Sequence, residues 1–243
     1  MKLLLLHLSD AHFKDKTYID NSIIESQVQT LNKIDKFDKC CIVFSGDISF
    51  SGQINEFKKA SYYLGKLWKL IGKKFEPQYG VSTYMVPGNH DINFDGISRD
   101  RSEICELKRE TITEQQISDE LLKFAGFYDF ANFYHNFYSN KLVENKIITI
   151  ANKKVQINLI NSELFSICND SHNDDDKSLH FLPENEWVKL SKAKNVDLVI
   201  TVSHRGPEWF DWDSCNQFKK KLIEETDIFL YGHEHIDNID MVC

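Results

Sequence analysis

The hexapeptide Val86-Pro87-Gly88-Asn89-His90-Asp91 joins a short apolar run to a cluster of polar side chains. The apolar run, residues 82–86, is typical of a buried β-strand. Glycine lets the backbone turn tightly where such a strand ends. A strand that stops at an amide, an imidazole and a carboxylate indicates a site beyond the carboxyl end of a sheet.

Four other apolar runs, at residues 3–8, 40–44, 196–202 and 228–231, also end in polar residues. The clusters that follow them are Asp10-x-His12, Gly46-Asp47, Ser203-His204 and Gly232-His233-x-His235. The carboxyl ends of parallel strands open at one edge of an α/β sheet, so we expect all five clusters to meet. Each cluster alone is weak evidence, because Asp-x-His and single histidines are common by chance.

Helical patterns separate several of these strands, which predicts an α/β fold. Helical spacing of apolar residues predicts helices at residues 57–71, 183–193 and 214–225. An aromatic-rich helical insert is expected at about residues 92–140, and residues 146–150 and 155–160 predict a hairpin with a bulge or a longer turn. With no repeat or linker, we interpret residues 1–243 as a single domain.

Composition and charge narrow the class of protein. The net charge of −8 lowers the expectation of tight non-specific nucleic-acid binding, although bound cations would offset several carboxylates. The apolar run at residues 3–8 is too short for a signal peptide, and no stretch is long enough to span a membrane. Six cysteines without CxxC spacing indicate free thiols, so we expect a cytoplasmic location and no membrane partner.

The clustered side chains have the chemistry of metal ligands. Carboxylates, imidazoles and one amide, without a thiolate, suit divalent ions such as manganese, iron or zinc. They are too many for one ion and about enough for two ions that share a bridging carboxylate. Two ions about 3.5–4 Å apart can hold both the attacking and the leaving oxygen of an in-line displacement at phosphorus.

The ordered motifs resemble those of the calcineurin-like metallophosphoesterase superfamily. The family pattern DxH, GDxxxxG, GNHD, a later histidine and GHxH is matched at Asp10 to His12, Gly46 to Gly52, Gly88 to Asp91, His204, and Gly232 to His235. This resemblance implies a four-layer α/β/β/α sandwich of two mixed sheets flanked by helices. It also implies a metal-dependent phosphoesterase that acts through a metal-activated water.

The resemblance also implies a role for each motif residue. One metal is expected on Asp10, His12, Asp47 and His235, and the other on Asp47, Asn89, His204 and His233. We expect manganese, with iron, zinc, nickel or magnesium as alternatives. His90 is expected to contact the phosphate or to protonate the leaving oxygen. Asp91 either orients the His90 ring or has a structural role, and Arg205 either clamps a phosphate or forms a salt bridge.

The substrate is expected to be a phosphodiester of nucleotide type. The second motif continues Ile48-Ser49-Phe50-Ser51, without the arginine of the protein-phosphatase branch, and residues 6–10 and 86–91 are more similar to the phosphodiesterase and nuclease branches. Trp209 or Trp212 either stacks a base or closes an apolar loop. The alternatives are a DNA or RNA nuclease, a phosphomonoesterase, and an inactive binding module.

A further expectation concerns the whole protein. The second motif, followed by a helix, resembles phosphoesterase domains at the front of larger bacterial proteins, some of them linked to phage defence. The chain is therefore expected to be the N-terminal catalytic part of a longer protein with additional C-terminal domains. Oligomeric state is left open by the sequence.

Overall fold

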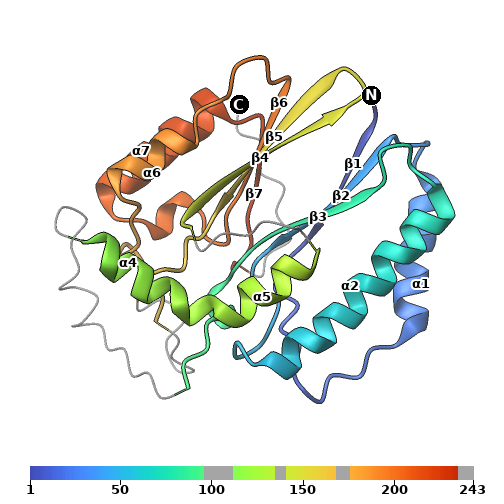
Figure 1. Cartoon of the computed structure of the whole chain (residues 1–243), viewed down its shortest axis with the longest axis horizontal. Helices are drawn as coiled ribbons and strands as arrows, with labels where there is room; N and C mark the ends of the chain where they lie inside the picture. The colour runs from blue at the N-terminus through green and yellow to red at the C-terminus, as the bar shows by residue number, and fades with distance from the viewer. Residues whose placement is uncertain (96–111, 135–140, 168–175, 235–243) are drawn as a thin grey trace.

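The computed structural model describes residues 1–95, 112–134, 141–167 and 176–234. Two β-sheets lie face to face, and helices cover their outer sides (Figure 1). The layered α/β/β/α arrangement expected from the sequence is therefore confirmed.

The first sheet contains the strands that carry the first three motifs. Its order is β1 (Leu3–Leu8), β2 (Lys39–Ser45) and β3 (Val81–Val86), and both pairings are parallel. The central strand β2 is buried along its whole length, which explains its nearly continuous apolar sequence. In register, Leu8 lies opposite Phe44, and Ser45 lies opposite Val86. The three strands therefore end nearly level, and the three motif loops leave the sheet side by side.

The second sheet carries the last two motifs. Its order is β4 (Val143–Ile150), β5 (Lys153–Ile160), β6 (Leu198–Val202) and β7 (Ile228–Leu230). β4 and β5 pair antiparallel, and the other two pairings are parallel. The predicted hairpin is confirmed, but its turn is shorter than expected. Ile150 pairs with Lys153, so only two residues turn the chain, and Ala151 adopts the left-handed conformation at φ 55°.

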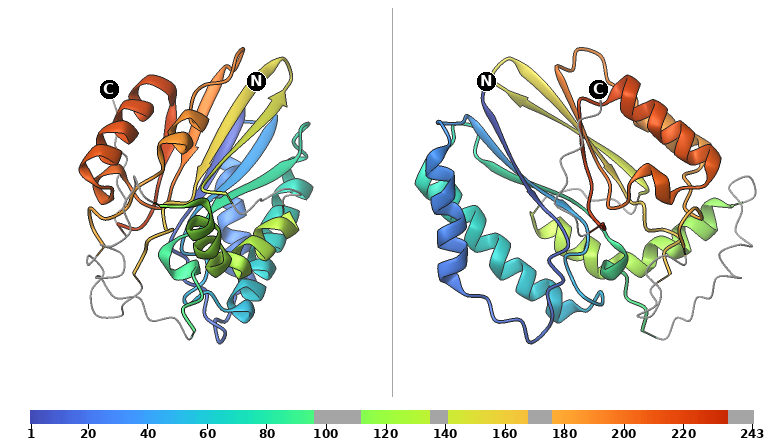
Figure 2. Two further views of the ribbon diagram at one scale, coloured as in Figure 1. Left: turned by 60° about the vertical axis from the view of Figure 1, so that its left-hand side comes forward. Right: turned by 180° about the vertical axis from the view of Figure 1, so that it is seen from behind.

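Helices cover the outer face of each sheet, the face that points away from the other sheet (Figure 2). The described helices are α1 (Asn21–Thr30) and α2 (Ile54–Phe75) beside the first sheet, α6 (Glu184–Lys189) and α7 (Trp212–Glu225) beside the second, and α4 (Glu114–Leu121) and α5 (Ala125–Tyr134) within the insert. Short 3-10 turns occur at Leu31–Lys33, Asn89–Asp91, Leu122–Phe124 and Pro207–Trp209. Residues 96–111 and 135–140 of the predicted insert lie outside the described residues.

Local sequence explains where the longest helix begins and ends. At the start of α2, the Glu56 carboxylate accepts hydrogen bonds from the backbone N–H groups of Ser51 and Gln53. At its end, Glu76 turns into the left-handed region at φ 44°, and two lysines lie in the last turn. The structure also contains α1, which the sequence patterns did not predict, and α6 ends at Lys189 rather than at residue 193.

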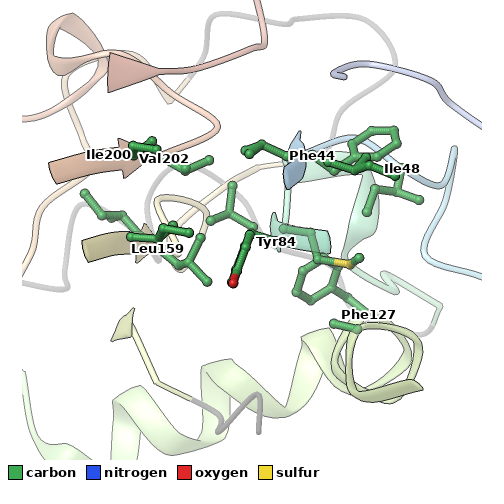
Figure 3. Packing of buried hydrophobic residues seen from close by; sticks show 14 of the residues in the cluster. Phe44, Ile48, Tyr84, Phe127, Leu159, Ile200 and Val202 are labelled. Carbon is green, nitrogen blue, oxygen red and sulfur yellow. The ribbon is translucent and has the colours of Figure 1, made fainter. Parts of the chain in front are cut away.

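A continuous apolar core fills the space between the sheets (Figure 3). Phe44 and Tyr84 from the first sheet face Leu159, Ile200 and Val202 from the second. The insert closes one end of this core, where Phe130 of α5 stacks on Phe57 of α2 at 5.4 Å between ring centroids. The aromatic residues Phe124, Phe127, Tyr128 and Phe130 of the insert are buried and form a packing surface, whereas Phe133 is 78% exposed. This shared core fixes the position of one sheet's motif loops relative to those of the other.

Candidate metal centre

The motif loops of the first sheet continue its ladder beyond the strands. The backbone N–H of Asp10 donates to the Gly46 carbonyl at 3.1 Å, and the N–H of His12 donates to the Asp47 carbonyl at 3.0 Å. Across the core, the N–H of Gly232 donates to the His204 carbonyl at 3.0 Å. Main-chain hydrogen bonds therefore link the Asp10–His12 loop to the Gly46-Asp47 loop, and the Gly232 loop to the loop of His204.

Four of the motif residues have backbone conformations that side chains other than glycine rarely adopt. Asp10, His12, Asp47 and His233 have φ values of 53°, 46°, 53° and 73°. The left-handed conformation costs roughly 1–2 kcal/mol per residue, although Asp and His tolerate it better than most. Such strain persists where the surrounding structure fixes it, and it concentrates at functional sites. Here it turns the four side chains toward a common point.

Asp47 lies at the centre of the site. Its side chain is 1% exposed, and its Oδ2 lies 3.4 Å from His204 Nε2 and 3.7 Å from His12 Nε2. Its Oδ1 accepts a hydrogen bond from the His90 backbone N–H at 2.9 Å. Potential ligand atoms of Asp47, His12 and His90 lie within 4.8 Å of one another, as do those of Asp47, His204 and His233. Asp47 is thus the member common to two ligand groups.

Two further motif residues complete the cluster. The Asn89 Oδ1 lies 3.2 Å from His204 Nε2. Both carboxylate oxygens of Asp10 accept from the His233 backbone N–H at 3.2 Å. The structure therefore brings together six of the seven residues expected to bind metal, and the seventh, His235, lies outside the described residues.

The charges in this cluster favour a bound cation. Burial alone would raise the pKa of the Asp47 carboxyl, but His204, with His90 and His12, holds that pKa well below its usual range. Burial would likewise lower the pKa of His204, but the Asp47 carboxylate raises it to about 10. The Asp47 carboxylate therefore favours positive charge at this position. A metal ion held there would supply that charge, with His204 as a neutral ligand.

Small residues let the loops approach this closely. A Cβ at Gly46 would lie 2.4 Å from His204 Nδ1, and a Cβ at Gly88 would lie 2.1 Å from Asp47 Oδ1. Only glycine fits at these two positions without displacing a candidate ligand. The donor set, its burial and its demand for positive charge all fit divalent metal ions.

His90 and Asp91 occupy different parts of the site. The His90 ring is half-exposed, and its Nδ1 lies 2.7 Å from the Phe50 carbonyl oxygen. The Asp91 carboxylate accepts from the backbone N–H groups of Ile48, Ser49 and Gly88 at 3.2, 2.7 and 3.0 Å. Burial, and then the charge of Asp47, raise the pKa of Asp91 to about 6. Asp91 thus ties two motif loops together, and the Phe50 carbonyl contacts the His90 ring.

Arg205 is buried behind the cluster. Its Nε donates to Glu163 Oε2 at 2.8 Å, and its Nη2 donates to Asp176 Oδ2 at 3.1 Å. Its Nη1 lies 3.2 Å from His233 Nε2, and its guanidinium stacks 4.2 Å from the centroid of the Trp209 ring. With 1% exposure, it forms the salt bridges that were one of the two expectations for it.

The Arg205 network sets the charge of its neighbours. Burial alone would raise the pKa of Glu163, but Arg205, together with His204 and His180, lowers that pKa to about 2. Burial, followed by the charge of Arg205, lowers the pKa of His233 to about 3, so His233 keeps a neutral ring. A neutral imidazole is the form that binds a metal. Trp209 is buried within this network, whereas Trp212 is 80% exposed at the start of α7.

Sequence reasoning missed Glu163, although the signal was present. Strand β5 ends at Ile160 and is followed by Asn161-Ser162-Glu163, a polar cluster at a strand end like the five others. Asp176, the second carboxylate around Arg205, does not follow any strand in the part of the chain that the structure describes. It could be found only from the folded structure.

Comparison with known families agrees with the geometry. The family model described as calcineurin-like phosphoesterase matches residues 3–237, which is nearly the whole chain. No curated protein matches the chain. The family implies divalent metal cofactors and phosphoester substrates, and the structure supplies candidate residues for the metals. The chain therefore belongs to the calcineurin-like phosphoesterase family of metal-dependent phosphoester hydrolases.

Proposed function

We propose that the chain is a dinuclear metal-dependent phosphodiesterase that hydrolyses phosphodiester bonds of nucleotide type. The observation that carries the dinuclear part is the position of Asp47, which belongs to both ligand groups. A carboxylate has two oxygens and can bind two cations at once. A centre with a single metal would leave either His12 or the pair His204 and His233 without a ligand role.

The proposed ligand sets follow the motifs. Asp10, His12, Asp47 and His235 hold one ion. Asp47, Asn89, His204 and His233 hold the other. Manganese is proposed as the metal because mixed oxygen and nitrogen ligands suit it. Bound there, the pair of ions supplies a water of lowered pKa and positive charge for the phosphoryl oxygens.

His90 is proposed as the general acid. The Phe50 carbonyl can only accept a hydrogen bond, so the contact at 2.7 Å places a proton on His90 Nδ1. The protonated ring then has its second proton on Nε2, which donates it to the leaving oxygen. Asp91 is proposed as a positioning residue, because its carboxylate holds the loops that carry Asp47 and His90.

The preference for diesters rests on sequence and on the state of Arg205. The second motif has no arginine, and the guanidinium of Arg205 is already paired with Glu163 and Asp176. A monoester dianion carries more charge to be neutralised than a diester monoanion. The described part of the site therefore lacks an unpaired arginine that could bind the additional charge of a monoester.

A substrate panel tests this function. Manganese-loaded protein is expected to hydrolyse bis(4-nitrophenyl) phosphate and cyclic nucleotides faster than 4-nitrophenyl phosphate. Cleavage of single- or double-stranded DNA or RNA would instead favour a nuclease, and faster monoester hydrolysis would favour a phosphomonoesterase. Two bound ions without any turnover would favour a binding module.

Two variants test the roles of the residues. Asp47→Ala is expected to remove bound metal and activity together, as measured by elemental analysis and initial rates. Asp197→Ala is the matched control, because this exposed aspartate pairs with Lys153 away from the motif loops. His90→Ala is expected to lower turnover while metal stays bound, and unchanged turnover would contradict the proposed acid. One ion per wild-type chain at saturation would contradict the dinuclear centre.

A cytoplasmic location is also proposed. The described cysteines Cys40, Cys41 and Cys215 are free thiols, as is typical of a reducing compartment. Among the described residues, no helix combines the length and the apolar composition needed to cross a membrane.

A further inference from the structure

Two loops beside the candidate metal centre run next to each other and carry residues that no motif requires. Phe13 and Ser49 form an isolated parallel bridge. The N–H of Phe13 donates to the Ile48 carbonyl at 2.9 Å, and the N–H of Phe50 donates to the Phe13 carbonyl at 3.1 Å. These main-chain bonds place Lys14 and Phe50 beside each other, next to the residues that follow β1 and β2.

Phe50 presents an aromatic ring at the edge of the metal site. Its ring centroid lies 5.5 Å from that of His90 and 6.3 Å from that of His12. The side chain is 37% exposed, unlike Ile48, which is fully buried in the core. Packing in the core therefore does not explain a phenylalanine here. An exposed aromatic ring next to the proposed general acid is a surface on which a planar group can stack.

Lys14 supplies a positive charge at the same edge. Its Nζ lies 4.0 Å from the centroid of the Phe50 ring, in a cation–π arrangement. Its side chain is exposed, and no carboxylate of the described part of the chain lies within 4.0 Å of its Nζ. Arg205, by contrast, is buried between two carboxylates. The Lys14 charge is thus available to an anionic ligand.

We propose that Lys14 and Phe50 form a substrate subsite that binds the nucleoside part of the substrate. The inference rests on the proposed phosphodiesterase function and adds the residues that recognise the nucleoside. The base stacks on the Phe50 ring in place of the ammonium group. The ammonium, on its flexible four-carbon stem, moves to the phosphate on the neighbouring side of the sugar. The scissile phosphate lies at the metal centre, so the subsite recognises a nucleotide rather than a simple diester.

The Phe50 part is tested with two esters that share one leaving group. Thymidine 5′-(4-nitrophenyl phosphate) carries a base, and methyl 4-nitrophenyl phosphate does not. The ratio of their kcat/KM values reports recognition of the nucleoside. Phe50→Leu, which keeps the backbone carbonyl that contacts His90, is expected to lower this ratio roughly tenfold, as is typical of one lost stacking contact. Phe133→Leu is the control, because Phe133 is 78% exposed on α5. An unchanged ratio in Phe50→Leu overturns the proposed stacking.

The Lys14 part is tested with one additional charge. A 3′-phosphate on the thymidine ester is expected to raise kcat/KM severalfold in the wild type, through one added ion pair. Lys14→Gln is expected to abolish this gain. Lys2→Gln, at the opposite end of β1, is expected to keep it. An equal gain in wild type and Lys14→Gln overturns the assignment of Lys14.

A binding measurement separates the subsite from the proposed reaction. 2-Deoxyribose 5-phosphate has a hydroxyl group where thymidine 5′-monophosphate has its base, and the Kd values of the two compounds are measured by titration calorimetry. A tighter Kd for the nucleotide in wild type, lost in Phe50→Leu, supports the subsite even where neither ester is hydrolysed. In that case the proposed reaction fails and the subsite stands. Equal Kd values for the two ligands in the wild type overturn the subsite, whichever esters are cleaved.

Discussion

Replacing Gly88 with alanine adds a single methyl group, and we predict that this change abolishes metal binding. Gly88 has an ordinary backbone conformation with φ −105°, so the substitution introduces no backbone strain. The effect comes from space alone. The new Cβ would lie 2.1 Å from Asp47 Oδ1 and 2.3 Å from the Asp47 backbone nitrogen, whereas ordinary contact begins at 3.4 Å.

The size of the effect follows from these distances. Asp47 must move by about 1 Å, while metal–ligand distances tolerate only about 0.2 Å. A displacement of that size costs about 100-fold in rate at an active site. Relief of the overlap in a packed interior costs about 1–3 kcal/mol in the free energy of unfolding. Gly88→Ala is therefore predicted to lose metal and at least about 100-fold in turnover.

Elemental analysis after gel filtration, initial rates and urea unfolding test this prediction. Gly72→Ala, within α2, is the matched control, because its Cβ would lie no closer than 4.0 Å to its nearest neighbour, Val81 Cγ2 of β3. Alanine is favoured over glycine in a helix, so this control should gain about 0.5–1 kcal/mol and keep its metal. A Gly88→Ala variant with a full metal complement and wild-type turnover would refute the proposed position of Asp47.

Three further predictions concern stability. Arg205→Met should lower the free energy of unfolding by about 3–5 kcal/mol in urea titrations, because it leaves Glu163 and Asp176 buried without their cation. Arg205→Lys should recover part of this loss. Full stability of the methionine variant would contradict the ion-pair network. The folded-state pKa of Glu163, about 2, lies below its ordinary value of 4.5, so its contribution of about 3 kcal/mol should be present above pH 4.5 and disappear as the pH falls toward 2. The stability advantage of wild type over Glu163→Gln should shrink across that range, and a difference independent of pH would contradict this. Manganese at 100 times its Kd should stabilise the wild type in thermal unfolding by about 2.7 kcal/mol for each ion bound, and an equal shift in Asp47→Ala would refute binding at this site.

The sequence by itself determined the strands, the class of fold and the chemistry of the motifs. Short apolar runs that end in polar residues are local patterns, and the strands observed at β1, β2, β3, β6 and β7 follow them closely. Ligand chemistry is a property of the residue type, so carboxylates, imidazoles and an amide already indicated divalent metals. Helix α1 escaped prediction because only Ile24 and Val28 on it are buried, which gives too weak a periodicity.

Only the tertiary structure decided how these residues act together. Asp47 joins two ligand groups because two sheets pack across one core, and sequence spacing does not encode that packing. The same packing buries Arg205 between Glu163 and Asp176. Its charge therefore neutralises two buried carboxylates and is not exposed at the surface. It also leaves Lys14 and Phe50 at the edge of the site. Local patterns fix which side chains a strand offers, whereas the distances between strands depend on every contact in the core.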